Sequence, residues 1–128
     1  MVVIDTHVLI HDVIEPKRLS PRARRALNGA HGALAASDVS LWEIALLIAR
    51  GKIEPAMDPV QFIADIVAAR GLQVLPITAQ IAVLAQSEAF EHGDPADRII
   101  GATAIAHGAQ LVTADTRLRR VKGLRVLW

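Results

Sequence analysis

Short apolar runs alternate with longer mixed segments along this chain. Residues 1–5 are mostly β-branched and end in Asp5, a pattern that predicts a buried strand closed by a charge. Runs that are apolar on both faces are typical of strands in a covered parallel sheet. We expect strands at residues 1–5, 34–38, 72–75, 110–113 and 124–128.

The segments between these runs carry helix-start and helix-stop signals. A Ser or Asp before Pro puts a capping side chain beside a residue suited to the first helical position. Glycine is typical just after a helix end. We expect helices from Ser20-Pro21 through Leu27, stopping near Gly29 or Gly32, from Ser40 to Arg50 before Gly51, from Asp58-Pro59 to Gly71, over residues 78–90, and from Asp94-Pro95 to Gly108.

The alternation of strands and helices predicts an α/β fold with a parallel sheet covered by helices on both faces. The chain has 128 residues, the size of one domain, and shows no linker, internal repeat or low-complexity tract. We therefore expect residues 1–128 to form a single domain. A hydrophobic share of 52% exceeds what one core needs and indicates a partner surface.

The composition also narrows the setting of the protein. Cysteine is absent, which excludes disulfides and thiolate zinc sites and allows a reducing compartment. The first residues lack a basic region and reach Asp5 at once, so we expect no signal peptide. The longest uncharged stretch, residues 71–87, is short and interrupted by Pro76, so we expect a cytoplasmic protein without a membrane span.

Positive charge is clustered although the chain is nearly neutral, with 14 Lys and Arg against 13 Asp and Glu. Clustered cations can follow a phosphate backbone even at small net charge. A solvated surface explains either cluster alone slightly better. The two clusters are Lys17, Arg18, Arg22, Arg24 and Arg25, and Arg117, Arg119, Arg120, Lys122 and Arg125.

Two acids near helix starts have a purely structural explanation. Ser40 and Glu43 match a capping box, in which the acid reaches back to the start of its helix. Asp94 and Asp97 repeat the spacing with aspartates, which the helix dipole favours. Asp58 starts a helix with no acid three residues later, so an Asp-Pro start is useful without a second carboxylate.

The structural explanation is weaker when four acids are taken together. Asp5 ends the first predicted strand and Asp115 follows the fourth, and open parallel sheets bind ligands at the carboxyl ends of their strands. Glu43 and Asp97 are expected near the same edge. Four carboxylates in one place repel one another and favour a bound cation. Oxygen ligands without Cys or a His cluster suit Mg²⁺ or Mn²⁺.

Several stretches of the chain together resemble one family. In the family's order and across nearly the whole chain, they resemble PIN-domain ribonucleases, specifically the toxin subunit of VapBC-type toxin–antitoxin pairs. Four acid-bearing stretches in register make this resemblance specific. The stretches are "VIDTHVLI", "SLWEIALLIARGKI", "LPITA", "DPADRIIGATAIAHG" and "LVTADTRLR", with the closing "VLW".

The resemblance implies a three-layer sandwich on a five-stranded parallel sheet and a ribonuclease that depends on Mg²⁺, with Mn²⁺ as a substitute. It further implies an RNA substrate, a cognate antitoxin that binds near the active site, and a homodimer. Ala96 stands where the family usually has an aromatic residue, which alters local packing but keeps the acids. Carried across, the resemblance implies an acidic quartet of Asp5, Glu43, Asp97 and Asp115.

Metal chemistry suggests a role for each acid, with one ion or two left open. We expect Asp5 and Asp97 to bind a first ion directly. Asp115 would hold a second ion or a water ligand, and Glu43 would bind a metal-bound water or orient the nucleophile. Asp94 is an auxiliary acid or, as we favour, only the helix cap.

Other polar residues near these acids keep two interpretations each. Thr113 and Thr116 flank Asp115 and either hydrogen-bond the site or serve as local caps. Arg98 contacts a phosphate or pairs with a neighbouring acid.

Histidines and tryptophans add little to the expected site. His7 and His11 lie four residues apart, but zinc needs a third ligand, so His7 orients a carboxylate or faces solvent. Trp42 and Trp128 fit a core or an interface better than a base-stacking surface. The helix after Ser40 is apolar almost all round, and another molecule would supply part of its cover.

Other functions are compatible with parts of the pattern. A phosphatase with an Asp nucleophile would want a second Asp where His7 stands, and a phosphoacceptor domain would want an Asp where Pro76 stands. A catalytically silent PIN-like binding module conflicts with the complete quartet. A housekeeping RNA-processing nuclease of the same fold stays open.

Overall fold

The sheet has five strands, and all of its pairings are parallel. The computed structural model describes residues 1–29, 33–91 and 93–128. The strand order is β3-β2-β1-β4-β5, so β1 lies at the centre and the predicted α/β class is confirmed. The strands are β1 (Val2–Ile4), β2 (Leu34–Ser37), β3 (Gln73–Leu75), β4 (Gln110–Val112) and β5 (Arg125–Leu127).

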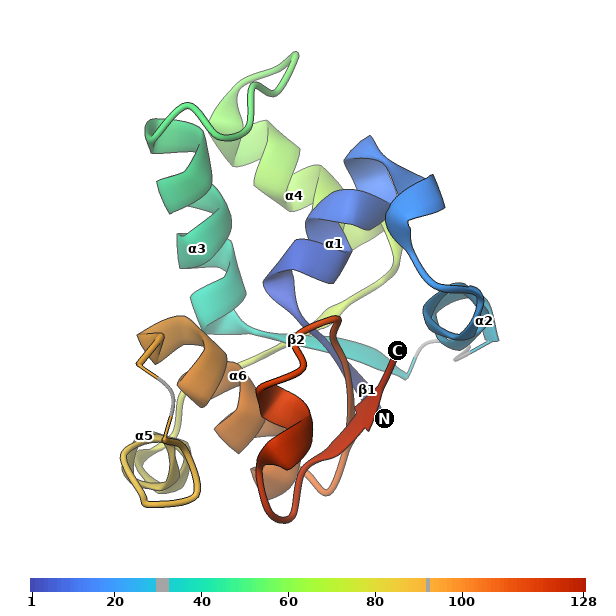
Figure 1. The fold of residues 1–128 in the computed structure, drawn as a ribbon. Helices are drawn as coiled ribbons and strands as arrows, with labels where there is room; N and C mark the ends of the chain where they lie inside the picture. The colour runs from blue at the N-terminus through green and yellow to red at the C-terminus, as the bar shows by residue number, and fades with distance from the viewer. Residues whose placement is uncertain (30–32, 92) are drawn as a thin grey trace.

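Helices connect the strands and cover both faces of the sheet (Figure 1). Among the described residues, no helix is long and apolar enough to cross a membrane. The helices are α1 (Thr6–Ile14), α2 (Pro21–Gly29), α3 (Asp38–Ala49), α4 (Pro59–Ala69), α5 (Ala79–Ala85) and α6 (Pro95–Ala106), with short 3₁₀ turns η1 (Pro16–Arg18) and η2 (Leu118–Arg120).

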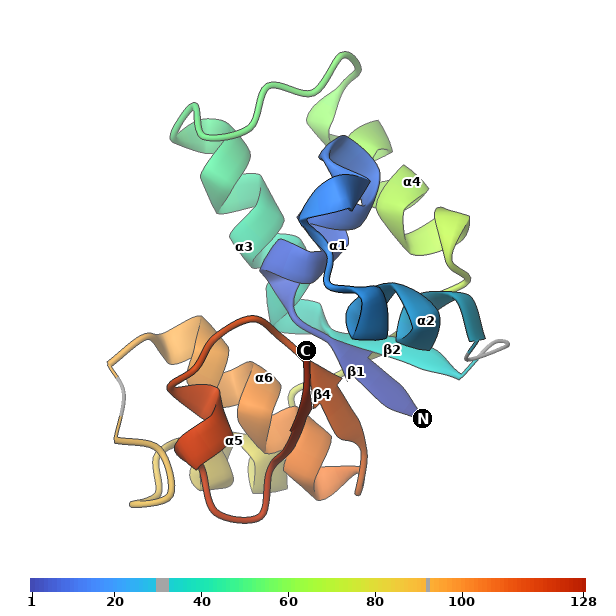
Figure 2. The same cartoon turned by 45° about the vertical axis from the view of Figure 1, so that its right-hand side comes forward.

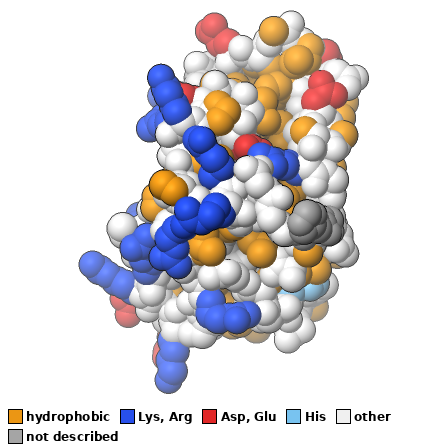
Figure 3. Space-filling view, turned by 90° about the vertical axis from the view of Figure 1, so that its right-hand side faces the viewer, with side chains coloured by type: hydrophobic (Ala, Val, Ile, Leu, Met, Phe, Trp, Pro, Cys, Tyr) orange, Lys and Arg blue, Asp and Glu red, His pale blue; other side chains and the backbone are white. Residues whose placement is uncertain are grey.

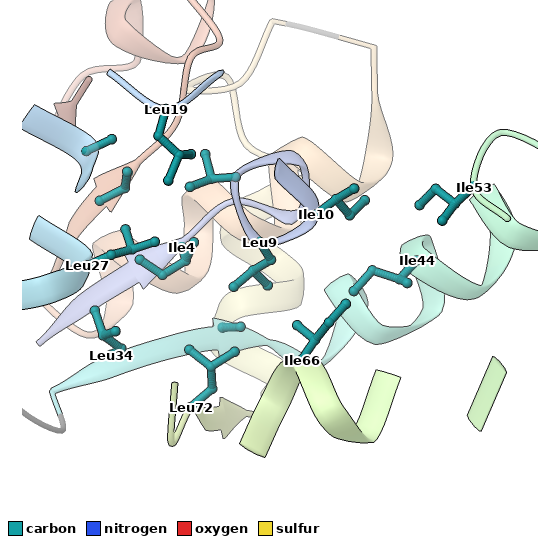
Figure 4. Close-up of a cluster of buried hydrophobic side chains, with 14 of the residues drawn as sticks. Ile4, Leu9, Ile10, Leu19, Leu27, Leu34, Ile44, Ile53, Ile66 and Leu72 are labelled. Carbon is teal, nitrogen blue, oxygen red and sulfur yellow. The ribbon is translucent and has the colours of Figure 1, made fainter. Parts of the chain in front are cut away.

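Two hydrophobic cores lie on opposite faces of the sheet. Ile4 packs with α1, α2 and α4, whereas its neighbour Val3 packs with α5, α6 and η2. Successive strand residues point to opposite faces, so both faces of β1 are apolar because both are covered. Figure 2 shows the resulting three layers, and Figure 4 shows the first core, with side chains from β1, β2, α1, α2, α3 and α4.

Most predicted helix boundaries are confirmed. Asp58 and Asp94 cap α4 and α6, and Ser20 accepts a hydrogen bond from the Ala23 N–H as a capping residue does. The chain leaves α6 at Gly108, where φ is +59°, a conformation that favours glycine. Helix α2 is described to Gly29, and the alternative end at Gly32 lies outside the described residues.

Two boundary predictions are wrong, and one helix was not predicted. Helix α3 begins at Asp38 with Ser37 as its cap, two residues before the predicted start at Ser40. Helix α5 ends at Ala85, and a turn carries the chain onward, so the predicted continuation to residue 90 is absent. Helix α1 was not predicted, because Asp5 leads directly from strand to helix without a Gly or Pro signal.

Candidate active site

The centre of the site is the junction between β1 and α1. The Asp5 N–H donates to the Val112 carbonyl at 3.0 Å, which extends the β1–β4 pairing to the strand ends. Thr113, just after β4, donates from Oγ1 to Asp5 Oδ2 at 2.8 Å and accepts from the Asp115 N–H at 3.1 Å. One buried hydroxyl therefore holds the Asp5 carboxylate and the Asp115 backbone together.

Glu43 reaches the site from the second turn of α3. Because Ser37 caps this helix, accepting from the Val39 N–H at 3.2 Å, Glu43 lies too far along it to close a capping box. The predicted Ser40–Glu43 box is therefore wrong. Ser40 instead accepts a hydrogen bond from Thr6 Oγ1 at 2.9 Å, and this buried pair joins α3 to α1. Glu43 is only 8% exposed.

The start of α6 brings two more carboxylates to the same place. Asp94 Oδ1 accepts from the Asp97 N–H at 3.2 Å, so the predicted cap is confirmed. Asp97 is 7% exposed. One ligand atom from each of Glu43, Asp94 and Asp97 lies within 4.8 Å of the other two. Asp94 thus caps its helix and also borders the acidic group.

The charges of the four predicted acids influence one another. The pKa of Asp97 is raised from 3.8 to about 8, chiefly by burial and then, in decreasing order, by the negative charges of Asp5, Asp94, Asp115 and Glu43. Burial also raises the pKa of Asp5, against the lowering effect of the Thr113 hydrogen bond. The structure therefore brings Asp5, Glu43, Asp97 and Asp115 together at one edge of the sheet.

Sequence reasoning missed the cation that faces these acids. Arg117 Nη2 lies 3.2 Å from Asp115 Oδ2 and 3.9 Å from Asp97 Oδ2. The Arg117 N–H also donates to Asp115 Oδ1 at 2.8 Å. Arg117 was assigned only to a basic cluster; its position two residues after Asp115, in a tight turn, was the available signal.

The other candidate residues lie outside the acidic group and have different contacts and exposures. Arg98 Nε donates to the Ala85 carbonyl at 2.8 Å, so it ties α6 to the end of α5, a role that neither interpretation foresaw. Trp42 is 60% exposed, so the core interpretation is wrong for Trp42. His7 and Thr116 are exposed, and the positive charge of His7 opposes the rise in the Asp5 pKa.

The residues of this edge fit a hard divalent cation. Asp5 Oδ1 and Glu43 Oε1 are buried and have no hydrogen-bond donor among the described residues. A buried carboxylate oxygen without a donor is costly, and a cation removes that cost. The group of possible metal ligands found in the described part of the chain consists of carboxylates, which suits Mg²⁺ or Mn²⁺ and not zinc.

The chain is similar to known proteins over most of its length. The family model described as "PIN domain" matches residues 2–124. Ribonuclease VapC22 of Mycobacterium tuberculosis is 41% identical over 121 residues, which cover 92% of this chain and 89% of that protein.

Solved structures share the fold at lower identity. VapBC2 from Rickettsia felis, bound to a DNA fragment from its promoter, superposes with a TM-score of 0.73 at 18% identity, covering 99% of this chain and 98% of that chain. DNA-bound VapBC from Salmonella typhimurium superposes with a TM-score of 0.71 at 21% identity, covering 98% and 96%.

Proposed function

The chain belongs to the PIN-domain family, as a VapC-type member, and from that premise we propose that it is a metal-dependent ribonuclease, the toxin of a type II toxin–antitoxin pair. The observation that carries the proposal is the pair of buried oxygens, Asp5 Oδ1 and Glu43 Oε1, that find no donor at the edge where the acids meet. A site built only to stabilise the fold would supply donors to these oxygens.

Asp5, Glu43, Asp97 and Asp115 would hold the Mg²⁺, with Mn²⁺ as a substitute. When bound, the ion lowers the pKa of a water and stabilises negative charge on the phosphoryl oxygens. Asp97 must give up its proton to become a ligand, so affinity for the ion should fall in acid.

Other residues of the chain orient these groups. Thr113 fixes one oxygen of Asp5, which leaves the other aimed into the site. Glu43, on a helix braced by the Thr6–Ser40 hydrogen bond, would bind a metal-bound water or orient the attacking water. RNA phosphodiester bonds are the proposed substrate.

The proposed partner is a cognate antitoxin. The solved relatives are toxin–antitoxin assemblies, and this chain leaves large apolar side chains exposed on several helices. A homodimer is the second proposed assembly. The exposed side chains include Val13 and Ile14 on α1, Trp42 on α3, Val60 on α4 and Val83 on α5.

The test is RNA cleavage by the purified protein with Mg²⁺, with a chelator, and by the Asp5→Asn variant. We expect cleavage only in the first case, with the variant folded. A chelator-resistant activity would contradict the metal site, and a folded wild-type protein that cleaves no RNA would favour a silent binding module.

The adjoining gene separates a toxin from a housekeeping nuclease. A small neighbouring gene that encodes a DNA-binding N-terminal segment is expected for a toxin. Suppression of toxicity by that gene product, when both are expressed together, would support the proposed pairing.

A further inference from the structure

A pocket of about 660 Å³ opens beside the acidic edge. One wall comes from the η2 turn and the residues around it, where Arg117, Arg120 and Lys122 contribute positive side chains. The other wall comes from the connection after α5, with Glu88 and Glu91. Arg117 belongs to both places, because it lines the pocket and also contacts Asp97 and Asp115. The pocket therefore adjoins the acidic edge at Arg117.

The η2 wall is firmly anchored. Leu118 and Val121 are buried in the core beneath α6, three residues apart. The basic residues between and after them, Arg119, Arg120 and Lys122, are exposed, and of these Arg120 and Lys122 line the pocket. The buried side chains anchor the backbone of the turn, and the cations lie on its solvent-exposed side.

Four other cations of the two basic clusters contact groups elsewhere in the described residues. Arg24 donates to the Pro16 carbonyl at 2.9 Å, and Arg125 donates to the Gly108 carbonyl at 2.7 Å. Lys17 and Arg18 lie 4.0 and 3.9 Å from carboxylate oxygens of Glu15. Figure 3 shows Lys and Arg side chains spread over the face that lies on the right in Figure 1, away from α3. Arg120 and Lys122 differ from these other cations because they line the pocket beside the acidic edge.

An RNA backbone cannot approach a group of four carboxylates without compensating positive charge. A metal ion held by these acids would act at the bond that is cut, so neighbouring phosphates would need cations of their own. We propose that Arg120 and Lys122 form a subsite that binds an RNA phosphate next to the one that is cleaved, with Arg117 at the boundary. This inference rests on the proposed ribonuclease function. Glu88 and Glu91 repel the backbone from the opposite wall and so keep it on the η2 side.

The test compares two double variants that remove the same charge. Arg120→Gln with Lys122→Gln alters the subsite, and Arg22→Gln with Arg25→Gln alters exposed cations of α2. Both pairs are made in the wild-type protein and in the Asp5→Asn background. Melting temperatures establish that all variants are folded, and the Mg²⁺-induced rise in melting temperature should be the same in both wild-type-background pairs.

Binding is measured with a fluorescein-labelled RNA stem-loop in the Asp5→Asn background, by anisotropy at several salt concentrations. We expect the subsite pair to weaken binding about tenfold at physiological salt and to reduce the slope of log K against log salt by about 1–2, whereas the α2 pair changes neither. In the wild-type background, KM for the RNA should rise while kcat stays nearly constant.

The outcomes separate the two proposals. The subsite is overturned if both pairs weaken RNA binding equally, or if the subsite pair does not weaken it. It is also overturned if the protein does not bind RNA. These conclusions hold whether or not RNA is cleaved. A wild-type protein that binds RNA through Arg120 and Lys122 but does not cleave it would support the subsite and contradict the nuclease.

Discussion

Thr113 Oγ1 lies 2.8 Å from Asp5 Oδ2, joining two residues that are 108 positions apart in the sequence. The same oxygen accepts from the Asp115 N–H, so the hydroxyl connects the ends of β1 and β4 at the acidic edge. Asp5 is therefore positioned by a side chain from the neighbouring strand as well as by its own backbone.

Replacing Thr113 by Val should lower Mg²⁺-dependent RNA cleavage by about 10–100-fold, because Asp5 loses the hydrogen bond that orients it. Thr113→Ser keeps the hydroxyl and should retain most activity. Initial rates of RNA cleavage for both variants, at saturating Mg²⁺, decide the matter. Equal activity of the two variants would mean that the hydroxyl has no orienting role.

Glu43→Gln should reduce cleavage roughly 100-fold without lowering the melting temperature. Gln keeps the shape of Glu but not its charge, and no cap is lost because Ser37 caps α3. Glu54→Gln, at an exposed position in the loop after α3, is the matched control. Normal turnover in Glu43→Gln would assign Glu43 a structural role.

Asp94→Ser should be tolerated and Asp97→Asn should not. Ser is a good N-cap, so it preserves the hydrogen bond to the Asp97 N–H. Asn at position 97 keeps the shape but loses the charge that faces the metal ion. RNA cleavage with melting curves distinguishes the two positions, and an inactive, folded Asp94→Ser beside an active Asp97→Asn would reverse their roles.

In the metal-free protein, stability should fall as the pH rises from about 4 to about 8. The pKa of Asp97 is raised from 3.8 to about 8, so between these values the folded state binds more protons than the unfolded state. Asp97→Asn cannot ionise and should be more stable than the parent at pH 8 by about 1–2 kcal/mol, allowing for partial contact with water.

Urea unfolding at acid and alkaline pH with a chelator measures this difference. Asp65→Asn, at an exposed position of α4, is the control and should follow the parent at both pH values. Parallel profiles for the parent and Asp97→Asn would show that Asp97 is ionised normally in the folded protein.

The sequence predicted those features that depend on local chemistry. Asp58 and Asp94 cap helices because an Asp-Pro pair specifies a helix start by itself. The start of α3 was misplaced because "SDVS" offers two serines three residues apart, and only the length of β2 decides which of them caps. Helix α1 was not predicted because no loop separates it from β1.

The meeting of sheet and helix ends at one edge was predictable, but the direction of individual side chains was not. The gathering of Asp5, Glu43, Asp97 and Asp115 followed from strand and helix ends, since parallel strands end at one edge. Arg117 was missed because its long side chain turns back onto Asp115 only in the conformation of that turn. The exposure of Trp42 was not predicted, because α3 is apolar almost all round and its periodicity does not show which face packs on the rest of the protein.

The absence of a loop at the β1–α1 and β2–α3 junctions limits how the length of this chain can vary. Asp5 is oriented by the register of β1, so one residue inserted in this strand would send its carboxylate to the other face of the sheet. Glu43 is oriented by the rotation of α3, so one residue inserted at the start of that helix would turn its carboxylate by about 100°. The irregular segment between α3 and α4 does not determine the orientation of Asp5 or Glu43. Insertions and deletions among relatives should therefore collect there, and the two junctions should keep a constant length.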